Sequence, residues 1–178
     1  IAGSCALFAL SFAADRVLPI NVTTLKPPLP FPPIFTAWNT FSRIDIFERP
    51  GNAEKDIPAM RRFVYDAGTA ATGSQDLRPT VREYLQKHTN DNDYPSGIAY
   101  IGKQNPNVLV IGSGGGAEVL DALHYGARSI TAVEINPIIN DVISGSMNDF
   151  WGGMFRLPEV SLVTEEGRSF VRRSGEMY

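Results

Sequence analysis

Two acidic side chains and a run of glycines are spaced along the sequence as in binding sites for nucleotide-type ligands. The apolar run Val108–Ile111 leads directly into Gly112, Gly114, Gly115 and Gly116, and an amphipathic segment follows. Glycine has no Cβ, so the backbone of such a turn can approach a ligand closely. Glu134 closes the next apolar run, 22 positions after Gly112. This order of strand, glycine turn, helix, strand and acid predicts a site for a ligand that contains a ribose.

The first acid, Glu134, is expected at the C-terminal end of a strand, where open α/β sheets bind their ligands. There its carboxylate could accept charge-assisted hydrogen bonds from both ribose hydroxyls. The alternative is a solvated acid that caps the following helix, and the preceding glycine turn favours the ribose. The second acid, Glu166, stands before Gly167 after a later strand. Its carboxylate could accept from the exocyclic amine of adenine, or stabilise the N-terminus of the next helix.

The glycine spacing leaves the class of ligand open. Gly112-x-Gly114-x-x-Ala117 followed by Glu134 also satisfies the pattern of a dinucleotide site. A domain of an NAD-dependent oxidoreductase is therefore an alternative to an adenosyl-binding enzyme. A module that holds a cofactor or nucleoside without chemistry is a third.

Residues 107–178 are predicted to form three βα units that position these groups. Strands are expected over 108–111, 129–134 and 159–164, with helices over 115–125, from 137 onward and over 167–173. Asn136 is expected to cap the second helix, and Phe170 and Val171 to face inward from the third. Successive βα units predict an α/β fold with a Rossmann-like, doubly wound parallel sheet and right-handed crossovers.

The preceding residues divide into two parts. Residues 36–106 predict a small β unit with strands over 41–48 and 62–66, followed by a helix over 76–88 in which Thr80 and Glu83 have capping-box spacing. Residues 1–35 hold an apolar segment and a proline-rich stretch typical of an extended linker. The apolar segment fits either the end of a transmembrane helix or a short buried helix, and the sequence leaves both open.

Composition narrows the classes of function. The chain has 178 residues, of which 43% are hydrophobic and 20% charged, as in globular domains. A net charge of −3 gives no indication of nucleic-acid binding. Cys5 is the single cysteine, which excludes an internal disulfide and a multi-cysteine metal site. His88 and His124 have no second ligand nearby in the sequence, so we expect no metal site.

Three segments together resemble the spermidine synthase (polyamine aminopropyltransferase) family, most of all its membrane-embedded, methyltransferase-like members. They are Val108–Leu120, Ala132–Pro137 and Val160–Phe170, and Trp38–Ile46 is similar to the opening β segment of those members. The resemblance implies a class I S-adenosylmethionine-dependent fold, here truncated after the third βα unit. It also implies a transferase that moves an aminopropyl or methyl group from decarboxylated or intact S-adenosylmethionine to a nucleophilic small-molecule acceptor, a polyamine among the candidates.

The resemblance also implies roles for individual residues. The glycine turn, through Gly112, Ser113, Gly114 and Gly116, would pack against the aminoacyl part of the cofactor. Glu134, with Ile135 beside it, would hold the ribose. Glu166 and Gly167 would lie at the adenine.

Several positions depart from the family pattern. Aminopropyltransferases usually carry an acid at the place of Gly115, where it faces the ammonium group of decarboxylated S-adenosylmethionine. Without that acid, an open glycine turn at a helix N-terminus suits a carboxylate, which makes intact S-adenosylmethionine a serious candidate. The adenine-side acid is normally Asp rather than Glu166. The Tyr-His-Glu type motif of the polyamine site is not matched at residues 94–96.

The resemblance places the general base beyond Tyr178. We therefore expect no catalytic residue within the chain and no transferase activity from the chain by itself. A membrane-embedded parent protein would carry this domain on its cytoplasmic side, and otherwise the protein would be cytoplasmic.

Overall fold

The computed structural model describes residues 32–55, 60–65, 70–88 and 95–178. The apolar segment, the proline-rich stretch up to residue 31 and Tyr94 lie outside these ranges, so the expectations for them stay predictions. No helix within the described ranges is long and apolar enough to cross a membrane.

Four antiparallel strands form the first sheet, in the order β1-β2-β3-β4. They are β1 (Phe35–Trp38), β2 (Arg43–Arg49), β3 (Met60–Tyr65) and β4 (Ala70–Gln75), and the short helix η1 (Ala53–Lys55) follows β2. In β2 the side chains of Ile44 and Ile46 are fully buried. Asp45 is buried as well, and its carboxylate contacts Arg43 Nε at 2.8 Å. The described residues thus form a four-stranded sheet, in which β2 and β3 lie close to the two predicted strands.

The strand β4 was not predicted. Its sequence, AATGSQ, lacks the β-branched and aromatic alternation that marks a half-buried strand. It forms by pairing with β3 along its whole length, from Met60 opposite Gln75 to Tyr65 opposite Ala70. Tertiary pairing thus overrides a weak local preference.

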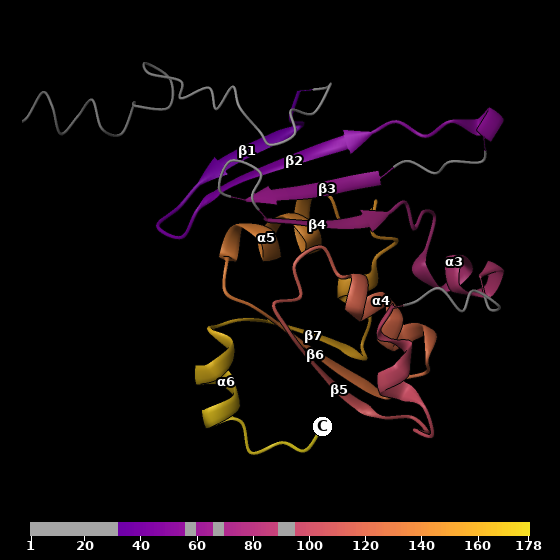
Figure 1. Cartoon of the computed structure of the whole chain (residues 1–178), viewed down its shortest axis with the longest axis vertical. Helices are drawn as coiled ribbons and strands as arrows, with labels where there is room; N and C mark the ends of the chain where they lie inside the picture. Colours follow the sequence, from indigo (N-terminus) through magenta and orange to yellow (C-terminus); the bar gives the residue numbers. More distant parts are fainter. Residues whose placement is uncertain (1–31, 56–59, 66–69, 89–94) are drawn as a thin grey trace, which may run out of the picture.

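The second sheet is parallel and has the order β5-β6-β7. Its strands are β5 (Asn107–Ile111), β6 (Ser129–Glu134) and β7 (Val160–Thr164), and the helices α4 (Ala117–His124), α5 (Pro137–Asp141) and α6 (Gly167–Arg173) follow them in turn. The α/β fold with parallel βα units is confirmed. Figure 1 shows α4 and α5 between the two sheets, with α6 beside the parallel sheet.

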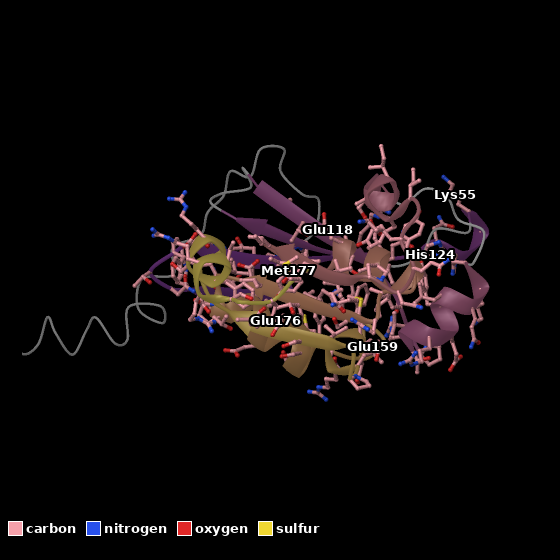
Figure 2. All side chains as sticks on the ribbon, turned by 90° about the horizontal axis from the view of Figure 1, so that it is seen from below. Lys55, Glu118, His124, Glu159, Glu176 and Met177 are labelled. Carbon is pink, nitrogen blue, oxygen red and sulfur yellow. The ribbon has the colours of Figure 1, made fainter. Side chains whose placement is uncertain are left out.

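The helix predicted over 76–88 is shorter than expected. The structure has α3 (Val81–Lys87), preceded by Thr80 in an extended conformation and followed, beyond a gap, by η3 (Pro95–Tyr100). Thr80 is the N-cap, since Glu83 N donates to Thr80 Oγ1 at 3.2 Å, while the Glu83 carboxylate accepts from the Thr80 hydroxyl at 3.3 Å. Arg82 of α3 pairs with Glu159 at 2.7 Å. Glu159, just before β7, is labelled in Figure 2. The cap fixes the start of the helix at Val81.

The helix after β6 also differs from its prediction. It begins as expected, with Asn136 as N-cap, but α5 ends at Asp141 and continues as the π-helical turn η4 (Val142–Ser146). The backbone of Gly145 is non-helical there, with φ −108° and ψ −107°. Ile139 and Ile143 are nonetheless fully buried, so both sides of the kink pack into the core.

Of the two α6 residues predicted to face inward, one does and one does not. Phe170 is buried, but Val171 is 49% exposed. Consecutive residues of an α-helix are separated by a rotation of about 100°, and with Phe170 turned inward Val171 falls on the exposed side of this short helix. Phe170 is the residue that packs inward.

One hydrophobic core joins both sheets, and Trp151 is its largest fully buried side chain. Trp151 Nε1 donates to the carbonyl oxygen of Gly115 at 2.7 Å. The ring thus packs among apolar residues while its polar edge is attached to the glycine turn. Other fully buried members of the core, which come from β2, the start of α3 and η5 (Met154–Arg156), are Ile44, Ile46, Val81 and Met154.

We expect Trp151→Phe to destabilise the protein by about 1–3 kcal/mol, because it removes the partner of a buried carbonyl and leaves a small cavity. Trp38→Phe is the matched control, since Trp38 is 49% exposed and surface changes usually stay within about 0.5 kcal/mol. Denaturant unfolding of both variants measures the difference. Equal stabilities would contradict a structural role for the Nε1 hydrogen bond.

Candidate functional site

The predicted site residues meet at the C-terminal ends of the parallel strands. Ile111 is opposite Val133, and Glu134 is opposite Thr164. Beyond the strands, Gly112 N and Ser113 N both donate to Val133 O, at 2.7 and 3.1 Å. Glu165 N donates to Glu134 O at 3.2 Å. Backbone hydrogen bonds therefore hold the glycine turn, the end of β6 and the start of the β7–α6 loop side by side.

Glu134 is the central acid of this edge. It is 6% exposed, and its two carboxylate oxygens accept from different loops. Oε2 accepts from Gly114 N at 3.1 Å, and Oε1 accepts from Asn136 N at 2.9 Å. A carboxylate offers about four lone-pair positions, so one acceptor position remains on each oxygen. The alternative of a solvated helix cap is wrong, because Glu134 is buried and the side chain of Asn136 caps α5 instead, accepting from Ile138 N at 3.1 Å.

The glycines of the turn have two different surroundings. Gly112 is exposed, has φ +74°, and a Cβ there would meet nothing within 4 Å. A Cβ on Gly114 would lie 2.9 Å from Thr72 Cγ2, and one on Gly116 would lie 2.5 Å from Phe155 Cζ. Gly114 and Gly116 therefore allow the turn to pack between β4 and η5. Gly112 is the glycine that leaves backbone open to a ligand.

The amide groups of the turn are used within the protein. Gly115 N donates to Thr72 Oγ1 at 3.2 Å, and Gly116 N donates to Ser113 O at 2.7 Å. With the bonds of Gly112, Ser113 and Gly114 given above, each N–H from 112 to 116 has a protein acceptor. These five amides are therefore engaged within the protein, because the turn folds against β4, Val133 and Glu134.

Ser113 has a hydroxyl without a partner. Its side chain is 1% exposed, and its Oγ makes no hydrogen bond to any residue that the structure describes. Buried polar atoms in proteins nearly always have a partner, so an exception needs an explanation. A polar ligand atom reaching this hydroxyl would supply the missing hydrogen bond.

The second predicted acid, Glu166, caps α6. Its exposed carboxylate accepts from Arg168 N at 3.0 Å, Ser169 N at 2.8 Å and Ser169 Oγ at 2.9 Å. These bonds, the backbone N–H of Arg168 foremost, lower the pKa of the Glu166 carboxyl from its ordinary value. The helix-capping interpretation of Glu166 is therefore correct. Oε1, which takes a single bond, keeps an acceptor position for a ligand.

The two remaining predicted site residues, Gly167 and Ile135, lie beside these acids in the sequence. A Cβ on Gly167 would lie 2.3 Å from Ile111 Cγ2, so the absence of a side chain lets α6 start against the end of β5. Ile135 is 40% exposed beside Glu134. Both lie at the same edge of the sheet as Glu134.

Sequence reasoning missed the contacts that come from outside the parallel sheet. Thr72 of β4 bonds to Gly115, and Asn39, between β1 and β2, donates to Asn136 Oδ1 at 2.7 Å. The bond from Trp151 to the carbonyl oxygen of Gly115 is a third such contact. These partners lie tens of residues from the motifs, and none belongs to a local pattern that would reveal it.

Comparison with known proteins shows a likeness over part of the chain. No protein-family model matches the chain. The polyamine aminopropyltransferase of Sulfolobus acidocaldarius is 30% identical over 73 residues, which are 40% of this chain and 24% of that protein. The enzyme of the same name from Sulfurisphaera tokodaii is 30% identical over 76 residues, 42% of this chain and 25% of that protein. The matched segments span about a quarter of the length of these curated relatives.

Solved structures with a similar fold match a larger part of the chain than the sequence relatives do. A spermidine synthase in complex with the transition-state analogue AdoDATO has a TM-score of 0.50 and 20% identity, covering 80% of this chain and 43% of that one. The spermidine synthase of Thermotoga maritima also has a TM-score of 0.50 and 20% sequence identity. The match covers 80% of this chain and 44% of that one. The chain therefore has an α/β fold of the spermidine synthase type, which is class I methyltransferase-like, and part of its sequence is homologous to polyamine aminopropyltransferases.

Proposed function

We propose that the edge formed by Gly112, Ser113 and Glu134 binds the adenosyl part of a sulfonium cofactor in a spermidine synthase-like transferase. The observation that carries the proposal is the buried carboxylate of Glu134, held by two backbone amides with one acceptor position left on each oxygen. Two vicinal ribose hydroxyls are donors that suit two neighbouring acceptor positions. The hydroxyl of Ser113 offers a third polar contact in the same turn.

The other residues have roles that fit this ligand. Glu166, through the free position on Oε1, would accept from the adenine amine. Gly112 would allow the ligand to approach the backbone, and Ile135 would pack beside it. The bound sulfonium makes its neighbouring carbons open to displacement by a nucleophile. What these residues contribute is the orientation of the cofactor, on which the rate of an in-line displacement depends strongly.

Two observations bear on which group is transferred, and they favour different cofactors. The relatives are named aminopropyltransferases, which favours decarboxylated S-adenosylmethionine and an amine acceptor such as a polyamine. Gly115, in the place of the family acid, leaves the ammonium without its usual partner in either cofactor, but it also removes a negative charge that would repel the carboxylate of intact S-adenosylmethionine, so methyl transfer is kept as a second candidate. We place aminopropyl transfer first and methyl transfer second. The acceptor remains a small nucleophilic molecule in either case.

An NAD-dependent oxidoreductase is the alternative from another class. The spacing of Gly112, Gly114 and Ala117 fits it, but the Asn-Pro pair after Glu134 and the acid-glycine pair at 166–167 favour the adenosyl sulfonium ligand. A cofactor-binding module without chemistry would share the same site. Binding measurements separate the ligand classes directly.

We expect Glu134→Gln to weaken binding of methylthioadenosine about 10- to 100-fold, since a hydrogen bond to a charged group contributes about 1.5–3 kcal/mol. The amide would also turn its NH₂ toward one of the backbone N–H groups that now face the carboxylate. Isothermal titration calorimetry of the purified chain measures the effect, with Glu118→Gln, an exposed acid on α4, as control. Binding of NAD with no response to adenosyl ligands would overturn the proposal.

The tail of the cofactor gives a second test. Since the turn offers neither an acid at 115 nor an unused amide, we expect methylthioadenosine and the intact and decarboxylated cofactors to bind within about threefold of one another, less than one hydrogen bond. Competition calorimetry against methylthioadenosine measures this. A preference above about tenfold for the decarboxylated form would require an acid outside the turn and would establish the aminopropyl donor.

Glu166 makes a prediction about pH. Its carboxyl should titrate below the ordinary range, and Ser169→Ala should raise its pKa by removing a hydroxyl donor. A lowered folded-state pKa means that the cap stabilises α6 above the pKa of the unfolded chain and is lost as the pH falls through the folded value. Carbon-detected NMR titration of the side chain measures both, with Ser174→Ala at the other end of α6 as control. An unchanged pKa in Ser169→Ala would contradict the capping geometry.

A further inference from the structure

The turn between β1 and β2 is hydrogen bonded to the loop that follows Glu134. Asn39 Nδ2 donates to Asn136 Oδ1 at 2.7 Å, across 97 positions of sequence. Asn136 Nδ2 in turn donates to Ser42 Oγ at 3.3 Å. These side chains connect the four-stranded sheet to the ligand-facing edge of the parallel sheet.

Backbone donors fix the orientation of both amides. Asn39 Oδ1 accepts from Phe41 N at 2.9 Å and from Ser42 N at 3.1 Å, so its NH₂ group must be the part that faces Asn136. Asn136 Oδ1 accepts from Ile138 N at 3.1 Å, so it must be an acceptor there. Neither amide can flip without losing a bond to a backbone N–H. The pair therefore has one arrangement.

The chain of contacts continues to the carboxylate. Asn136 is 3% exposed, and its own backbone N–H donates to Glu134 Oε1 at 2.9 Å. The side chain of Asn136 thus holds the residue whose main chain holds Glu134. A shift of the β1–β2 turn would move Asn136 and, through it, one of the two bonds that aim the acid.

We propose that Asn39 is a positioning residue for the cofactor site, acting through Asn136 on the orientation of Glu134. The inference rests on the proposed function, since it requires a ligand that docks on Glu134. It assigns the four-stranded sheet a part in setting the affinity for the ribose, because an acceptor already aimed at its donors binds them better than a mobile one.

The variant Asn39→Asp isolates the contact. It keeps the acceptor for Phe41 N and Ser42 N, which preserves the turn, and replaces the donor that faces Asn136 Oδ1 with an oxygen. We expect binding of methylthioadenosine to weaken at least about 3- to 10-fold, because the variant loses one hydrogen bond and sets a carboxylate oxygen against Asn136 Oδ1. Ser42→Ala, which removes the hydroxyl that Asn136 Nδ2 contacts, should weaken binding in the same direction and serves as a second variant should Asn39→Asp fold poorly. Thr40→Ala, an exposed change in the same turn, is the control and should bind as the unaltered chain does.

Two readouts separate positioning from a structural effect. Affinity is measured by calorimetry well below the unfolding transition of each variant, where a purely structural loss leaves the dissociation constant unchanged. In the background of Glu134→Gln, Asn39→Asp should have no further effect on affinity, since its action passes through that carboxylate. Unchanged affinity in Asn39→Asp and Ser42→Ala, or an equal loss with and without Glu134, would overturn the inference. An unaltered chain that binds none of the adenosyl ligands would instead overturn the proposed function.

Discussion

The buried carboxylate of Glu134 is the interaction on which the site depends. Its two oxygens accept backbone N–H groups from the glycine turn and from the loop before α5. A carboxylate taken out of water is costly unless its lone pairs are satisfied, so these bonds are a condition for burying the acid at all. Because each oxygen keeps one further position, the arrangement that makes burial tolerable also leaves the acid able to bind a ligand.

Local patterns were sufficient to predict the βα units. The glycine turn, the Asn136–Pro137 start of α5 and the capping pair of Thr80 and Glu83 each act within a few residues, where geometry follows from sequence spacing. The same logic predicted that Glu134 would stand at the end of a strand. The error at Val171 came from assigning two consecutive residues to one helix face.

Contacts between distant segments could not be predicted in this way. Thr72, in a strand of small and polar residues, supplies the acceptor for Gly115, and that strand exists only because β3 pairs with it. The contact of Asn39 could not be predicted either, since nothing near it in the sequence indicates a partner 97 positions later. The sequence thus predicted that Glu134 would lie at the end of a strand, while the groups that hold the turn and the acid in place could be identified only from the structure.

The hydrogen bonding of the glycine turn has a kinetic consequence. A loop that closes over its ligand must search conformations before it binds, and that search slows association and costs entropy. Here each amide from Gly112 to Gly116 already has a protein acceptor, and Trp151 anchors the carbonyl of Gly115 from within the core. The turn is therefore ordered before any ligand arrives, and binding at the proposed site would need no closure of the turn.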